Sequence, residues 1–121
     1  MLYTLLIILL SFNYATAQQY PPVKDASLAI EEKVNDLANQ YDRQLAMTAK
    51  QKALFKLKLE DYLLRRIEIE DKYNGKNELT MLAKLQARET QAMNDVLTQP
   101  QMEVYKRIKP EIQPLKVVKE K

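Results

Sequence analysis

A single glycine, Gly75, occurs in the 121 residues of the chain. β-Sandwiches, Rossmann folds and phosphate-binding loops need glycine at backbone angles that other residues avoid, so the sequence argues against all three. The chain is instead rich in Ala, Leu, Lys, Glu and Gln, which favour helix, and 29% of its residues are charged. The expected fold class is therefore all-α.

A short motif occurs twice, fifty positions apart, as MTAKQ from Met47 and LTQPQ from Leu97. A Thr before a helix accepts a hydrogen bond from the backbone N–H three residues later, and a Gln at that position accepts one from the Thr N–H. This reciprocal arrangement is a capping box. Leu97 is also expected to pack on Met102 as a hydrophobic staple. The helix-capping residues predicted on this basis are Met47, Thr48, Gln51, Leu97, Thr98 and Gln101.

Apolar residues recur every three or four positions along most of the chain, which predicts four amphipathic helices. Their expected bounds are Asp25 or Ser27 to Ala46, Thr48 to Tyr73, Asn77 to Val96 or Leu97, and Thr98 to Lys109. Asn74-Gly75 is expected to end the second helix in a left-handed conformation. Pro110 is expected to end the fourth.

The second predicted helix is apolar on more sides than one partner helix can cover, because Leu57 and Leu64 lie away from the face that carries Phe55. Its N-terminal half is basic, with four lysines before the first acid, Glu60. This segment is the candidate site for binding other proteins. The candidate residues are Lys50, Lys52, Phe55, Lys56, Lys58, Leu59 and Tyr62. An ordinary solvated helix face is the alternative, because lysine stems often cover apolar surface without binding anything.

The chain contains neither His nor Cys, on which hydrolytic chemistry and zinc sites usually depend. Its carboxylates alternate with Lys and Arg at helical spacing, as expected of surface ion pairs. The expected pairs are Asp61 with Arg65, Arg66 with Glu70, and Glu68 with Lys72. We therefore expect no enzyme activity, no catalytic residue, no cofactor, no metal site and no nucleic-acid partner.

The first seventeen residues are uncharged and mostly apolar, and they end in Ala15-Thr16-Ala17. This pattern predicts a secretory signal peptide, residues 1–17, that is cut before Gln18. A lipid anchor would need a Cys after the cut, so no stable membrane anchor is expected. The mature chain is expected to have an extended lead-in, residues 18–23, a helical domain, residues 24–109, and a basic flexible tail, residues 110–121.

The two motifs, the signal peptide and the lack of Cys together resemble the Spy/CpxP family of small periplasmic proteins, whose signature is LTxxQ. Met47 stands where that signature has Leu, and the chain is shorter than typical members. The resemblance implies helices in bent hairpins that pair antiparallel into a cradle-shaped homodimer. It also implies structural roles for the motif residues and a basic, apolar concave face.

The function implied by the resemblance is an ATP-independent periplasmic chaperone, a holdase that binds unfolded or aggregation-prone envelope proteins. The alternative is an envelope-stress regulator that docks on a sensor kinase or an anti-sigma partner through a basic face. A passive helical structural protein is a third possibility, and it predicts neither activity.

Overall fold

The structure, a computed structural model, describes residues 23–115, with side chains from residue 27 onward. Its elements are α1 (Val23–Leu45), α2 (Ala49–Lys72), α3 (Gly75–Ala92), the 3₁₀ turn η2 (Met93–Asp95) and α4 (Gln99–Ile112). This part of the chain contains four α-helices and no strand, which confirms the all-α prediction. The predicted signal peptide, most of the lead-in and residues 116–121 lie outside the described residues.

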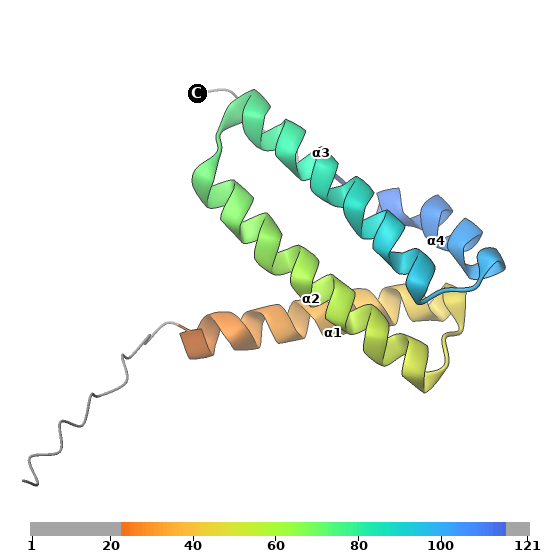
Figure 1. The fold of residues 1–121 in the computed structure, drawn as a ribbon. Helices are drawn as coiled ribbons and strands as arrows, with labels where there is room; N and C mark the ends of the chain where they lie inside the picture. Colours follow the sequence, from red (N-terminus) through yellow and green to blue (C-terminus); the bar gives the residue numbers. More distant parts are fainter. Residues whose placement is uncertain (1–22, 116–121) are drawn as a thin grey trace, which may run out of the picture.

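The helices α2 and α3 form an antiparallel hairpin, and α1 crosses α2 at an oblique angle (Figure 1). The C-terminal half of α1 packs against α2 and α4, while its first turns extend beyond the other helices (Figure 1). The core therefore lies where α1, α2 and α4 meet.

The apolar stripe predicted for the first helix is confirmed. Val34, Leu37, Tyr41 and Leu45 are buried, and Ile30 packs against the same cluster. The start of the helix differs from the prediction, because α1 already begins at Val23, ahead of the two expected caps. Val23 was expected to end the extended lead-in.

Only Tyr73 and Asn74 separate α2 from α3, and this turn differs from the prediction. Gly75 has the expected left-handed backbone, with φ 55°, but it opens α3 rather than closing α2. Asn74, not Asn77, is the residue before the helix, and its side chain makes no capping hydrogen bond. The positive φ of Gly75 lets the chain reverse at once, so no longer linker is needed.

The third helix ends earlier than expected and the fourth ends later. α3 stops at Ala92 and is followed by the tight turn η2, in which Val96 N–H donates to Met93 O at 3.0 Å. α4 runs through Pro110 to Ile112. The prediction that a flexible tail begins at residue 110 is therefore wrong, because the helix continues to Ile112. Gln113 N–H donates to Lys109 O at 2.7 Å, and the buried Gln113 side chain bonds Tyr41 and Glu89, so tertiary contacts hold the last turn against the preference of proline.

Three aromatic rings form the centre of the core. The Tyr41 ring lies 5.1 Å from Phe55 and 5.2 Å from Tyr105, centroid to centroid. Phe55 and Tyr105 occupy matching places after the two motifs, seven residues beyond Thr48 and Thr98. They pack edge to face at 5.9 Å. The two copies of the sequence repeat are therefore in contact in the folded chain.

Candidate functional site

The seven residues predicted to bind other proteins do not form one surface. Phe55 and Leu59 are fully buried and Tyr62 is 4% exposed. This part of the prediction is wrong for the fold as observed, because these three side chains lie on the face of α2 that packs into the core. They stabilise the core and are closed to a partner.

The four lysines of that set are spread around α2. Lys50 is exposed in the first turn. Lys52 Nζ lies 3.4 Å from Asp42 Oδ2, so its ion pair links α2 to the end of α1. Lys56 lines a groove between α1 and α2, whereas Lys58 lines a hollow between α2 and α3. Only the lysines remain available from the predicted site.

The side of α2 that faces away from the core is apolar and uncovered. Leu57 is 62% exposed, Ile67 51%, Leu64 45% and Leu54 38%. We call these four residues the outer face of α2. The prediction that one partner helix cannot cover the apolar surface of this helix is therefore confirmed.

A groove of about 600 Å³ runs between α1 and α2 beside the outer face. Its apolar lining comes from Ile30 and Val34 of α1 and from Leu57 and Leu64 of α2. Lys56 and Glu60 are among its polar lining residues. The groove is therefore amphipathic, with both charge signs at its edge.

Both capping boxes form as predicted. The Gln51 N–H donates to Thr48 Oγ1 at 3.1 Å, and the Thr48 N–H donates to Gln51 Oε1 at 3.0 Å. In the second copy the corresponding distances are 3.4 and 2.9 Å, between Thr98 and Gln101. Leu97 and Met102 are both buried in the same core cluster, as the staple requires.

The two boxes also bind one another, which the sequence did not indicate. Gln51 Nε2 donates to Gln101 Oε1 at 2.7 Å, and Gln101 Nε2 donates to Gln51 Oε1 at 3.2 Å. Each amide also reaches the turn opposite, Gln51 to Val96 O and Gln101 to Leu45 O, both at 3.1 Å. We call this arrangement the glutamine clasp. It joins the turn after α1 to the turn before α4.

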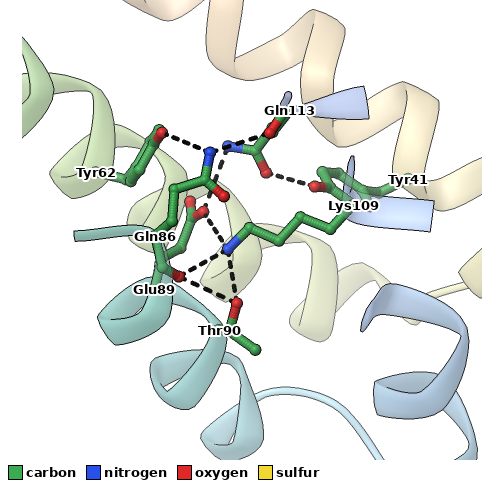
Figure 2. A network of polar contacts seen from close by, with 7 residues as sticks. All are labelled: Tyr41, Tyr62, Gln86, Glu89, Thr90, Lys109 and Gln113. Atoms are coloured by element: carbon green, nitrogen blue, oxygen red, sulfur yellow. Dashed lines mark hydrogen bonds and ion pairs between the residues drawn. The ribbon is translucent and has the colours of Figure 1, made fainter. Parts of the chain in front are cut away.

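A buried polar network fills the seam between α3 and α4 (Figure 2). Lys109 Nζ lies 2.9 Å from Glu89 Oε1 and donates to Thr90 Oγ1 at 2.7 Å and to Gln86 O at 2.9 Å. Glu89 is 4% exposed and Lys109 5%. Glu89 Oε2 is buried without a hydrogen-bond partner in the described part of the chain.

The same network extends to α1 and α2 (Figure 2). Gln113 Nε2 donates to Glu89 Oε1 at 3.4 Å, while the Tyr41 hydroxyl donates to Gln113 Oε1. Gln86 Nε2 donates to Tyr62 Oη at 3.3 Å and to Gln113 O at 3.0 Å. Every helix therefore contributes to one cluster.

Burial dominates the electrostatics of this network. Burial raises the pKa of the Glu89 carboxyl above its ordinary value, and the nearby Lys109 only partly offsets this. Burial lowers the pKa of Lys109, and Glu89 opposes that shift. Burial also raises the pKa of the Tyr41 phenol. For Glu89 and Lys109 the low-dielectric surroundings outweigh the favourable charge of the partner, which indicates a costly ion pair.

Helical spacing predicted surface pairs for the carboxylates and did not predict the burial of Glu89. A signal was present, because Leu82, Leu85, Glu89 and Met93 follow one another at spacings of three or four, on one helix face. Lys109 likewise stands four positions after Tyr105 on the buried stripe of α4. A charged residue in a core register predicts a buried partner.

Two of the three expected surface pairs form. Arg65 Nε lies 2.9 Å from Asp61 Oδ2, and Arg66 Nε lies 3.2 Å from Glu70 Oε1. Within residues 27–115 no ion pair joins Glu68 to Lys72. Both pairs are more exposed to solvent than the buried Glu89–Lys109 pair.

Within the described residues, no group of three or more His, Cys, Asp or Glu side chains is placed to hold a metal ion. None of the described helices combines the length and the apolar character that crossing a membrane requires. Comparison with protein-family models, with curated proteins and with solved structures gave no match.

Proposed function

We propose that the chain is an ATP-independent periplasmic holdase of the Spy/CpxP type, which binds unfolded or aggregation-prone envelope proteins. The observation that carries this proposal is the outer face of α2, where four large aliphatic side chains are between 38% and 62% exposed. Exposed apolar surface of this kind is characteristic of interaction sites. It replaces the buried side chains Phe55, Leu59 and Tyr62 as the apolar part of the client surface.

The surroundings of the outer face suit weak, reversible binding of many sequences. The adjoining groove is amphipathic, so it offers apolar contact beside polar groups of both charge signs. Lys50 and Lys56 flank the leucines with long stems and charged ends. Such side chains keep an apolar surface hydrated and still adapt to different partners.

A homodimer is part of the same proposal. A mature chain of about a hundred residues has a small core for its surface, and pairing of two copies would add buried area. The resemblance to the Spy/CpxP family favours an antiparallel pair that forms a cradle. Sedimentation of the mature protein, alone and with an unfolded client, measures both assembly and capture.

The proposal is tested by light scattering from insulin whose chains aggregate after reduction. The chain contains no Cys, so the reductant leaves it unchanged. The variant Leu57→Ser/Leu64→Ser should keep the fold and hold clients about tenfold more weakly, since partial burial of two leucines is worth about 1.4 kcal/mol or more. The matched control Leu79→Ser/Leu115→Ser removes two exposed leucines elsewhere and should retain the activity.

Two outcomes would contradict the proposal. One is that the unaltered protein fails to suppress scattering at several-fold molar excess over insulin. The other is that the control variant loses as much activity as the outer-face variant, which would show that the outer face has no special role.

A further inference from the structure

The exposed charges of α3 all have one sign. This helix has three cations and two acids in its sequence, so its charges nearly balance along the chain. Folding separates them, because Glu78 is 6% exposed and Glu89 4%, whereas Lys76, Lys84 and Arg88 are all exposed. The outward surface of α3 is therefore basic. The nearly balanced charges of its sequence do not predict this.

Two of these cations face a groove between α2 and α3. Hollows of about 240 and 170 Å³ adjoin there, since both are lined by Arg65, Leu85 and Arg88. We call the combined feature the α2–α3 groove. Its cations are Lys58, Arg65, Lys72, Lys84 and Arg88.

Three acids line the groove against its five cations, so the groove keeps a net positive charge. Its acidic lining residues are Asp61, Glu68 and Glu89. Asp61 already pairs with Arg65, and Glu89 is engaged by Lys109 from the opposite side of α3. Of the five cations only Arg65 forms an ion pair with another described residue. Within residues 27–115 neither Lys84 nor Arg88 forms an ion pair, and neither does Glu68, which lines the same hollow.

The floor of the groove is apolar and its length is limited. Ile69, Met81 and Leu85 line it together with the ring of Tyr73. From Lys58 to Lys72 the α2 helix rises about 21 Å at 1.5 Å per residue. An extended peptide covers that distance with about six residues at 3.4 Å each.

The spacing of the cations matches the spacing of side chains on a strand. Lys84 and Arg88 are one helical turn apart, about 6 Å along the α3 axis. Alternate side chains of an extended chain lie about 6.7 Å apart on the same face. Carboxylates at alternate positions would therefore meet successive cations of α3, while the residues between them would point to the opposite face of the strand, toward α2.

We propose that the α2–α3 groove binds an extended acidic segment of a partner protein, about six residues long, with carboxylates at alternate positions. A narrow concave groove fits a single chain, whereas the plane of an anionic membrane would touch only its rims. The site is separate from the outer face of α2 and does not depend on the holdase function.

Fluorescence anisotropy of a labelled peptide, Glu-Leu-Glu-Ser-Glu-Leu, tests this inference directly. The peptide should bind at low salt, and raising the salt concentration should weaken binding several-fold. The matching peptide with Gln for Glu should bind at least tenfold more weakly. Lys84→Glu and Arg88→Glu should each lower the affinity about tenfold, while Lys76→Glu, the same change on the same helix outside the groove, should leave it within twofold.

The inference is overturned if the Gln peptide binds as well as the Glu peptide, or if Lys76→Glu weakens binding as much as Lys84→Glu. It is also overturned if the peptide does not bind at low salt, whether or not vesicles containing phosphatidylglycerol bind. Insulin scattering separates the two proposals, since Lys84→Glu should keep the holdase activity. Loss of both activities in that variant would make the groove part of the client surface and would refute a separate site.

Discussion

Replacement of Lys109 by Met should destabilise the fold far more than an ordinary core change of the same size. Lys109 Nζ contacts Glu89 Oε1, Thr90 Oγ1 and Gln86 O, so Lys109→Met removes three interactions at once. It leaves Glu89 with a single remaining donor, Gln113 Nε2 at 3.4 Å. Breaking a buried pair from one side in this way costs about 3–5 kcal/mol of unfolding free energy.

The double variant Lys109→Met/Glu89→Gln should be more stable than Lys109→Met alone. In the native network burial already outweighs the attraction between the two charges, as the raised pKa of Glu89 shows. Removing both charges therefore also removes both desolvation costs, and such replacements are often neutral or better. The expected double-mutant coupling is about 2 kcal/mol or more.

The pH dependence gives a second, independent check of the same reasoning. Because the pKa of Glu89 is raised in the folded state, its protonation stabilises the fold below the ordinary pKa, and this contribution is lost as the pH rises through the folded-state pKa. Without Lys109 that pKa rises further. The loss of unfolding free energy caused by Lys109→Met should therefore be smaller at pH 5 than at pH 7.

Urea unfolding followed by circular dichroism at 222 nm measures all four proteins of the cycle at both pH values. If the losses of unfolding free energy in the two single variants add up to the loss in the double variant, Glu89 and Lys109 do not interact and the prediction is refuted. A penalty that is equal at pH 5 and pH 7 would show that the carboxylate is not buried and ionised in Lys109→Met.

Two further predictions concern the caps and the exposed ion pairs. Thr98→Ala should lower the unfolding free energy by about 1 kcal/mol through the lost cap, and an unchanged melting temperature would contradict the capping role. Asp61→Asn removes an exposed i, i+4 ion pair, so the urea midpoint should stay within experimental error, and a clear loss of stability would show that this pair is more than a surface contact.

The sequence predicted what is set by local chemistry. Thr48 and Thr98 start their helices as expected, because a capping box is completed within four residues and needs no tertiary partner. The buried stripe of Met102, Tyr105 and Ile108 is equally local, since it follows from helical spacing. The fold class was therefore predictable.

What the sequence did not predict depends on which helix covers which face. α2 is apolar on several sides, and periodicity alone does not say whether the side with Phe55 or the side with Leu57 faces the core. The structure places Phe55 inside and Leu57 outside, which moves the candidate client surface to the opposite face. Pro110 was misjudged for the same reason, because Gln113 is held by contacts distant in sequence.

The glutamine clasp explains why both capping boxes contain Gln rather than Glu. Either residue completes a capping box, and Glu would also gain about 0.3–1 kcal/mol from the helix dipole. Only Gln, however, carries the amide donors that reach Gln51 Oε1 and Leu45 O from position 101. Helix capping and tertiary bonding therefore make opposite predictions for Gln101→Glu.

If the clasp matters, Gln101→Glu should destabilise the fold by about 2 kcal/mol, because Leu45 O loses its donor and two oxygens are brought face to face. The matched control Gln99→Glu places the same charge in the same first turn at an exposed position, and should be neutral or slightly stabilising. Urea unfolding distinguishes the two variants. Stabilisation by Gln101→Glu would mean that Gln101 acts only as a local cap and that the clasp contributes nothing to holding the two turns together.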